Sequence, residues 1–456
     1  MKTGVRLKIL RRTLRERRLL AQYVHELKVP NLQSDATTFA QEMISIVASI
    51  VMTCPNFERL LGFYPIYNHE FDRLTQALST RPKLKEHAWI IGPNDAITQR
   101  SQKQLPPGLM DVDQVDCFIH YHLGWTSLTT LILHSETRGD DQGVLEHDIF
   151  IEVFQRLPAL RNLNISNFDI DDFNDLTLEH LPPLHSLRLE SLQGVTDRGL
   201  SRFASASAAQ HLQRLSLIHL PIQSLFIIAK LLAHLYKLTK FTLIQEASPT
   251  LPTEDIIIFQ PVVASNTLEF LHWDIISPDL TATEQLITSI RAAGFPSLRT
   301  IRAPSDHEGL LQSVCKPRSQ VVLPADKYST AHKTIPPTIY SYHKLFDARQ
   351  AAQRRIDEAR NTVQFKVVID EGGIVKQIYD FNGFLGQIGS QIFYSLKPDV
   401  LGKEEAIATV AQMRKGDEDG KEGCTGLWNA SHHAGKKWWW HRDRPRWRPV
   451  ELDSFF

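Results

Sequence analysis

One pattern of apolar positions recurs along the chain. A leucine or similar residue stands at the first, fourth and sixth places of a six-residue phrase, L-x-x-L-x-L. Its seven clear copies begin at Leu128, Leu160, Leu184, Leu212, Leu238, Leu268 and Leu298. Three weaker copies begin upstream at Val24, Phe57 and Leu84. Successive clear copies are 24 to 32 residues apart, so the chain repeats a unit of similar length.

Each unit predicts one short strand and one helix. The fourth to sixth places alternate apolar with polar residues, which is the period of a strand with one buried face. Helical limbs follow in several units, as in residues 148–157, 225–235 and 283–292. One strand with one helix cannot bury its own apolar face, whereas stacked copies can. We therefore predict an α/β leucine-rich-repeat solenoid, a horseshoe with a parallel concave sheet and outer helices.

A generic α/β protein with alternating helices and strands is the alternative interpretation. Seven well-formed copies over about 180 residues favour the repeat. A generic α/β protein would not be expected to repeat the same phrase in each strand. The widest gap separates the copies at Leu84 and Leu128. Residues 92–108 within it hold three prolines and two glycines, so we interpret the gap as an inserted loop.

The distribution of leucine marks where the repeat ends. Residues 1–311 hold 48 of the 55 leucines, about 15% of that segment, whereas leucine is only about 5% of the remainder. We therefore assign residues 1–318 to the solenoid and residues 319–345, which contain several prolines, to a connector. Residues 346–400 are predicted to form a helix and β-hairpin extension, and residues 401–456 a flexible, Trp-rich basic tail.

The extension and the tail carry their own patterns. Residues 346–360 (FDARQAAQRRIDEAR) are charged, alanine-rich and helix-favouring. Thr362–Glu371 and Ile374–Phe381, joined by Gly372-Gly373, predict a β-hairpin. The tail interleaves aromatic and basic residues around Trp438–Trp440, and we interpret it as a cap on the solenoid or a disordered tail. Stacking on single-stranded nucleic acid bases and placement in a membrane interface are the alternatives. No RNA-recognition or zinc-finger pattern supports nucleic-acid binding.

The concave side of the solenoid is the predicted binding surface. Because strands alternate, the third and fifth places of each phrase point away from the core. None of these fourteen places in the seven clear copies is acidic. The candidate protein-binding residues are Asn162, Asn164, Arg188, Arg214, Lys240, Phe270, His272 and Arg302.

Four of these candidates are cations and suggest a basic stripe. They are Arg188, Arg214, Lys240 and Arg302. Such a stripe would hold an acidic or phosphorylated segment of a partner protein through charge-assisted hydrogen bonds. A solvated polar face without a partner is the alternative interpretation.

One repeat carries a more specific phrase, Val195-Thr196-Asp197-Arg198-Gly199-Leu200. Together with the preceding strand (LHSLRLESLQGVTDRGL), it resembles the strand-to-helix join of cysteine-containing, or F-box-type, leucine-rich repeats. Thr196 or Asp197 is placed to cap the helix that follows. Leu10–Pro30 resembles the segment after the F-box in fungal F-box/leucine-rich-repeat proteins. The tail resembles the Trp-rich end of that group at Cys424, Gly426, Trp428 and Trp447–Val450.

The resemblance implies substrate recognition for a cullin–RING (SCF-type) ubiquitin ligase, in which an F-box binds the ligase adaptor. The chain departs from the family, because it has no segment with an L-P-x-E-type start that continues as three helices. An F-box encoded upstream of Met1 and an F-box-less relative are the two interpretations, and the adaptor is an expected partner only in the first. The alternative function is a repeat scaffold unconnected to ubiquitin.

The overall charge argues against other classes of partner. With 51 basic and 51 acidic residues, the chain is not a polyelectrolyte that coats nucleic acid or an acidic membrane. The longest apolar stretch, Met43–Met52, is ten residues long, and a bilayer span needs about 20. Residues 1–28 lack the apolar core of a secretory signal, and the four cysteines are scattered singly. We therefore expect a location in the cytoplasm or nucleus.

No residue pattern indicates catalysis, a metal or a cofactor. The chain has no G-x-S-x-G, GxxxxGK[ST] or HExxH motif. Cys117-x-x-His120-x-His122 and Cys424 with nearby histidines lack the paired CxxC spacing of zinc sites. Gly383–Gly389 lacks the close glycine pair of a dinucleotide fingerprint. We expect a non-enzymatic protein-binding module.

Overall fold

The computed structural model describes residues 3–30, 37–93, 112–136, 144–251, 260–316, 350–355, 365–381, 386–387, 389–395, 407–415 and 449–456. The chain divides into two compact units. Unit 1 comprises Met1–Val144, Glu152–Leu160 and Leu401–Phe455, and unit 2 comprises Leu145–Ile151, Arg161–Val400 and Phe456. Helix α7 (His147–Gln155) lies at the boundary between the two units in the sequence.

Unit 1 contains a parallel sheet formed by the upstream repeats. Its strands are, in order, β1 (Glu26–Lys28), β2 (Arg59–Leu61), β4 (Glu86–Ile91) and β5 (Thr130–Ser135), and β3 (Ile66–Tyr67) pairs with β4. Its helices include α1 (Thr3–Glu16), α2 (Arg18–Ala21), α3 (Thr37–Thr53), α4 (Arg73–Ser79) and α6 (Val112–His122). The third places of the phrases stand side by side, since Arg59 pairs with both Glu26 and Glu86. The weaker upstream copies are therefore repeats of the same kind.

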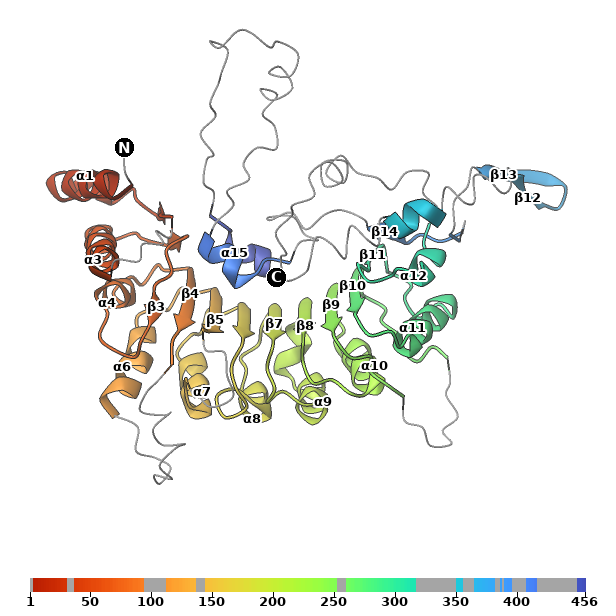
Figure 1. Ribbon diagram of the computed structural model, residues 1–456, viewed down its shortest axis with the longest axis horizontal. Coiled ribbons are helices and arrows are strands. Elements are labelled where there is room, and N and C mark those ends of the chain that lie inside the picture. The colour runs from red at the N-terminus through yellow and green to blue at the C-terminus, as the bar shows by residue number, and fades with distance from the viewer. Residues whose placement is uncertain are drawn as a thin grey trace, which may run out of the picture. The chain divides into compact units, whose positions relative to one another are not determined.

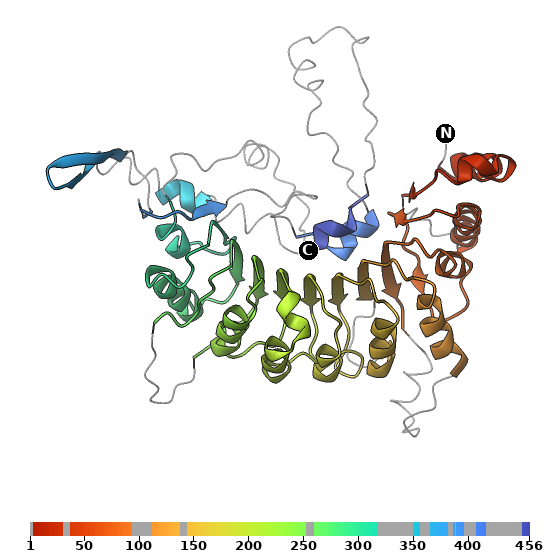
Figure 2. The same cartoon turned by 180° about the vertical axis from the view of Figure 1, so that it is seen from behind.

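Unit 2 contains the later repeats in the same layout. Its parallel strands are, in order, β6 (Asn162–Ser166), β7 (Ser186–Glu190), β8 (Arg214–Ile218), β9 (Lys240–Gln245), β10 (Phe270–Ile275), β11 (Thr300–Arg302) and β14 (Phe393–Ser395). Its helices include α8 (Asp175–Glu179), α9 (Asp197–Ser205), η1 (Ala208–His211), α10 (Leu225–His234), α11 (Thr281–Arg291) and α12 (Leu310–Ser313). Figures 1 and 2 show α8 to α11 together on one side of this sheet.

Leucines at the first, fourth and sixth places fill the space between sheet and helices. Leu184, Leu187 and Leu189, from one repeat, are 2%, 1% and 0% exposed. Burial of one such side chain contributes about 1.5–3 kcal/mol, and the contribution recurs in every repeat. The helices predicted at residues 225–235 and 283–292 correspond to α10 and α11. The prediction of an α/β leucine-rich-repeat solenoid is confirmed.

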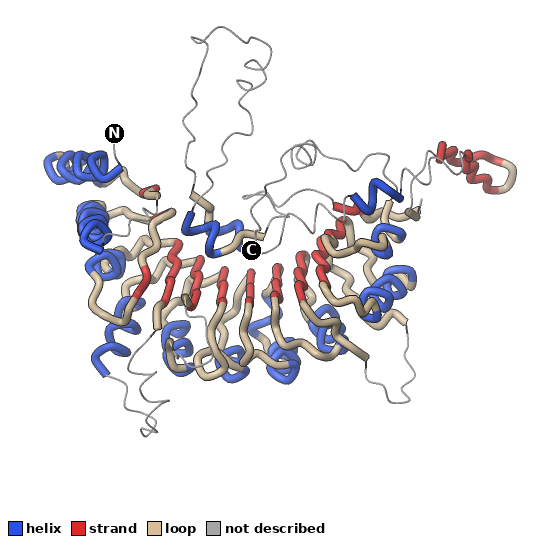
Figure 3. The backbone as a smooth tube through the Cα atoms, in the orientation of Figure 1, coloured by secondary structure: helices blue, strands red, loops and turns tan. Residues whose placement is uncertain are grey.

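The extension contains one predicted element and one unexpected one. The predicted hairpin forms from β12 (Phe365–Glu371) and β13 (Ile374–Phe381), with positive φ angles at Gly372 and Gly373 (Figure 3). Residues 350–355 are helical, as expected, and the connector at 319–345 lies outside the described residues. Strand β14 was not predicted: it follows the hairpin in the sequence and pairs with β11 as one more parallel strand.

Two pieces of the tail are folded. Helix α15 (Val410–Lys415) and the 3₁₀-helix η3 (Leu452–Phe455) belong to unit 1, and Met413 and Leu452 are completely buried. These pieces therefore differ from the expected flexible tail, because their apolar side chains pack against the protein. The Trp-rich stretch and Cys424 lie outside the described residues.

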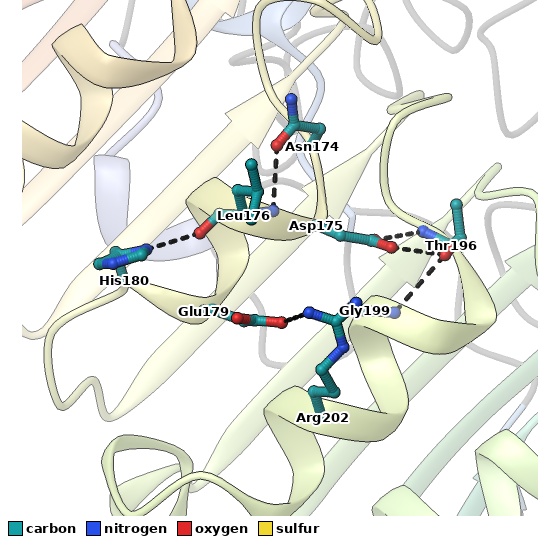
Figure 4. A network of polar contacts seen from close by, with 8 residues as sticks. All are labelled: Asn174, Asp175, Leu176, Glu179, His180, Thr196, Gly199 and Arg202. Atoms are coloured by element: carbon teal, nitrogen blue, oxygen red, sulfur yellow. Dashed lines mark hydrogen bonds and ion pairs between the residues drawn. The ribbon is translucent and has the colours of Figure 1, made fainter.

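The T-D-x-G-L phrase links neighbouring repeats in unit 2 (Figure 4). Thr196 caps α9, because its Oγ1 accepts a hydrogen bond from the main-chain N–H of Gly199 at 3.5 Å. The carboxylate of Asp175, in the preceding repeat, accepts hydrogen bonds from the N–H and Oγ1 of Thr196 at 2.8 and 2.6 Å. The residue that caps one helix is thus held by the repeat before it.

Asp197 repeats this link one unit further on. Its carboxylate accepts hydrogen bonds from the main-chain N–H groups of Gln223 and Ser224 at 3.3 and 3.0 Å, and Ser224 caps α10. Of the two caps that the sequence allowed, Thr196 is the cap and its neighbour Asp197 is the cross-link. Asn174 and Asp175 share the same two roles one repeat earlier. The phrase therefore fixes how successive repeats stack.

Candidate functional site

We call the side of each sheet that faces away from the helices the strand face. It carries the third, fifth and seventh places of each repeat phrase, and the strand register of unit 2 aligns these places in rows. The third-place row is Asn162, Ser186, Arg214, Lys240, Phe270 and Thr300, continued by Phe393 of β14. The fifth-place row is Asn164, Arg188, Ser216, Thr242, His272 and Arg302. All eight candidate residues lie in these two rows.

The fifth-place row is buried. Asn164, Arg188, His272 and Arg302 are at most 2% exposed. Contrary to the expectation from the sequence, Arg188 and Arg302 are therefore not part of an accessible basic stripe. Neighbouring strands are only about 4.8 Å apart, so a long side chain in the middle of the face lies against its neighbours and finds its polar partners there.

Arg188 is paired within its own strand. Its Nη2 and Nε lie 2.6 and 3.1 Å from the same Oε2 atom of Glu190, two residues further on. Two N–H donors on one carboxylate oxygen form a charge-assisted pair in a buried setting. The Arg188 side chain is only 2% exposed, so the Glu190 carboxylate helps to balance a buried charge, and this pair is part of the structural framework of the face.

Arg302 and His272 form a second buried contact. Arg302 Nε donates to His272 Nε2 at 3.4 Å. Burial, and then the positive charges of Arg302 and Lys240, hold the pKa of His272 well below its usual value. The imidazole is therefore neutral at pH 7 and can accept this hydrogen bond. Nearby, the carboxylate of Asp274 accepts a hydrogen bond from the hydroxyl of Ser305.

Glu190 and Asp274 are site residues that the sequence analysis missed. Both occupy the seventh place of their phrase, and the analysis examined only the third and fifth places. Strand alternation continues one step further, so the same rule would have placed both carboxylates on the strand face. The face therefore carries acids as well as bases.

Apart from the buried Ser186, the third-place row is the accessible part of the face in unit 2. Arg214 is exposed, and Asn162, Lys240, Phe270 and Thr300 are half-buried, while Phe393 is 44% exposed. The Nζ of Lys240 lies 5.7 Å from the centre of the Phe270 ring and donates to the main-chain oxygen of Phe456 at 3.0 Å. The Nζ of Lys316 lies 5.3 Å from the Phe393 ring. Across five strands the row thus presents two adjacent cations, Arg214 and Lys240, followed by the rings of Phe270 and Phe393 on either side of Thr300.

Asn164 leads to a prediction about stability. Within the described part of the chain, its side chain is fully buried and neither its Oδ1 nor its Nδ2 has a hydrogen-bond partner. An unsatisfied buried amide costs about 1–3 kcal/mol, so Asn164→Leu is expected to raise the free energy of unfolding by a similar amount. Urea denaturation would measure the change, with Asn162→Leu at the half-buried neighbouring place as the control. A destabilised Asn164→Leu protein would contradict this account.

The strand face of unit 1 carries paired charges. Arg59 Nη2 lies 2.9 Å from Glu86 Oε1, and Lys28 Nζ lies 2.9 Å from Glu26 Oε1. Burial raises the pKa of Glu86 to about 7; Arg59 opposes the rise and three neighbouring carboxylates add to it. Within the described residues, Glu86 Oε2 and Arg59 Nε are buried without a hydrogen-bond partner. This pair therefore retains unused hydrogen-bonding capacity.

An aromatic and histidine cluster lies in the core of unit 1. The Nε2 of His122 accepts from Trp89 Nε1 at 3.2 Å, and its Nδ1 lies 2.8 Å from the carbonyl of Phe118, which places the proton on Nδ1. Burial lowers the pKa of His122 to about 4 and that of His87, which packs edge-on against Trp89, to about 3. Cys117 is exposed. Of the Cys117-x-x-His120-x-His122 pattern, His122 therefore lies in the core, and Cys117 does not.

Among the residues that the structure describes, no group of three or more His, Cys, Asp or Glu side chains is arranged to hold a metal ion. In the same part of the chain, no helix is both long and apolar enough to cross a membrane.

No family model matches the sequence, and no curated protein matches it. Among solved structures, an internalin from Listeria monocytogenes is similar, with 12% sequence identity, coverage of 65% of this chain and 80% of that chain, and a TM-score of 0.30. So remote a similarity adds nothing to the fold assignment, for which the repeated phrase, the parallel strands and the helix caps suffice.

Proposed function

We propose that the protein is a protein-binding repeat module that captures its partner on the third-place row of unit 2. The observation that supports this most directly is the combination of exposed Arg214 and half-buried Lys240 with the half-buried ring of Phe270 and the exposed ring of Phe393. Arginine and large aromatic side chains contribute most to protein interfaces, because they bury large areas and form several contacts each.

The chemistry of the row indicates the kind of partner. Arg214 and Lys240 are adjacent in register, so one acidic or phosphorylated side chain can contact both cations. Phe270 and Phe393 are separated by one strand, and they offer apolar area to the next residues of the same segment. The partner is therefore a protein segment that carries an acidic group beside apolar residues.

Charge reversal on this row tests the proposal. In the double variant Arg214→Glu, Lys240→Glu, partner capture is expected to fall at least about tenfold, since two attractive contacts become repulsive. Quantitative mass spectrometry of proteins that co-purify with each variant would measure capture. Lys237→Glu, an exposed site outside the row, is the matched control. Arg188 and Arg302 are left unchanged because they are buried. Equal capture by the double variant and the wild type would refute the proposed row.

The finer proposal is substrate recognition for a cullin–RING ubiquitin ligase, in the cytoplasm or nucleus. Its support is the resemblance of the T-D-x-G-L phrase and of Leu10–Pro30 to F-box/leucine-rich-repeat proteins. An in-frame F-box in the gene upstream of Met1, or co-purification with the ligase adaptor, would support this role. If neither is found, the protein is a repeat scaffold unconnected to ubiquitin.

A further inference from the structure

The residues 449–455, which we call the resident segment, lie on the strand face of unit 1. Its 3₁₀-helix contacts β5, and Figures 1 and 2 show it with α15 on the side of β4 and β5 that faces away from α4 and α6. Val450, Leu452 and Phe455 are at most 3% exposed, whereas Glu451 and Asp453 are exposed. The segment therefore buries its apolar residues and leaves its acids at the rim, as a docked peptide does.

One polar attachment of the segment is a solvent-exposed ion pair. Glu451 Oε1 lies 3.3 Å from Lys28 Nζ, and Lys28 is shared with Glu26. Both Glu451 and Lys28 are more than 40% exposed, and an ion pair in that setting stabilises little. The three buried apolar side chains of the resident segment therefore contribute more to its binding than this ion pair does.

The resident segment is also a poor electrostatic match for the surface beneath it. Glu86 is buried there, and Glu26, Glu451 and Asp453 all contribute negative charge close to it, whereas Arg59 is the cation that pairs with it. Lys28 pairs with Glu26 and Glu451 instead. No residue of the described chain uses Glu86 Oε2 or Arg59 Nε in a hydrogen bond. A segment with a positive or donating group in place of Asp453 would satisfy Glu86 better than the resident segment does.

We propose that the strand face of unit 1 is a docking surface for a short segment of a partner protein, and that residues 449–455 are its exchangeable occupant. The partner segment shares the apolar spacing of the resident segment and an acid opposite Lys28, but carries a cation or hydrogen-bond donor opposite Glu86. This inference rests on the proposed function, protein capture, and adds a second surface with its own specificity.

Peptides added to the full chain test the exchange. One fluorescent peptide has the sequence of residues 449–455, and a second carries Asp453→Lys. At pH 8, where Glu86 is mostly ionised, the lysine peptide is expected to bind about three- to tenfold more tightly, and the preference is expected to shrink at pH 6. Saturating peptide is expected to speed amide hydrogen exchange of the protein's own resident segment, because the two compete for one surface.

Two variants assign the effect to named residues. Glu86→Gln is expected to abolish the preference for the lysine peptide, whereas Glu70→Gln, at an exposed site of the same unit, should retain it. Lys28→Glu is expected to weaken the binding of both peptides. Because Lys28 is exposed, this variant is expected to fold, so it still tests the surface if Glu86→Gln is unstable.

Three results would overturn the proposal: no peptide binding up to millimolar concentration, binding without faster exchange of the resident segment, or a lysine preference that persists in Glu86→Gln. The assay uses no cellular partner and no residue of the third-place row of unit 2. A negative result in the peptide assay would therefore contradict the docking surface of unit 1 alone. Capture by the third-place row of unit 2 is tested separately, with the Arg214→Glu, Lys240→Glu variant.

Discussion

Replacing Gly199 with alanine is expected to lower the free energy of unfolding by about 2–4 kcal/mol. A Cβ at this position would overlap the carboxylate of Asp175 and lie only 2.9 Å from its Cβ. Asp175 would have to move, and its hydrogen bonds to the N–H and Oγ1 of Thr196 would be lost. Both the cap of α9 and the link between two repeats would then be lost together.

A double-mutant cycle shows whether the cost arises from this contact. In an Asp175→Gly background both the carboxylate and the Cβ that obstruct position 199 are gone. Alanine is a better helix former than glycine by about 1 kcal/mol, so Gly199→Ala should become neutral or stabilising there. Urea denaturation of the two single variants and the double variant would measure this. Gly389→Ala is the control, because a Cβ there meets nothing within 4 Å. Equal costs in both backgrounds would show that Asp175 is not the obstacle.

The repeat was predictable because its determinants are local. Leu184, Leu187 and Leu189 are buried by apolar residues of the preceding and following repeats. The neighbouring copies of the phrase place these residues in register. The hairpin was equally local, since Gly372 and Gly373 adopt the positive φ angles that its turn requires. Sequence periodicity therefore identified the fold, the strand register and the rows to which the eight candidate residues belong.

Accessibility within those rows was not predictable in the same way. Strand alternation predicts which side of the sheet Arg188 faces. It does not predict that Arg188 is buried, which depends on the ion pair that Arg188 forms with Glu190 on the same side. The strand β14 and the resident segment were missed for another reason. Their partners are remote, as with Lys28 and Glu451, which are 423 residues apart, and no periodic pattern connects such positions.

Acidification from pH 8 to pH 5 is expected to destabilise unit 1 by about 2 kcal/mol through His122 alone. Burial lowers the pKa of His122 from 6.5 to about 4, so at pH 5 the imidazole stays neutral when folded and binds a proton when unfolded. The unfolded state then binds more protons, and stability falls as the pH falls below 6.5. The 1.5 pH units between 6.5 and pH 5 correspond to about 2 kcal/mol. His87, with its pKa lowered to about 3, acts in the same direction.

Glu86 acts in the opposite direction. Its pKa is raised from 4.5 to about 7, so the folded state binds the extra proton between these values and acidification through that range is stabilising. The net pH dependence of the wild type therefore combines opposing contributions. The contribution of His122 must be obtained as the difference between the wild type and a variant without this histidine.

His122→Gln isolates that contribution. The glutamine side chain can still accept the hydrogen bond from Trp89 but does not titrate. Urea denaturation followed by tryptophan fluorescence at pH 5, 6, 7 and 8 should show that the difference in stability between wild type and variant shrinks by about 2 kcal/mol on acidification. His211→Asn, at an exposed site, should leave the pH dependence unchanged. If the stability curves of the wild type and His122→Gln remain parallel, His122 does not stay neutral in the folded core, and Trp89, His122 and Phe118 do not form a closed, buried cluster.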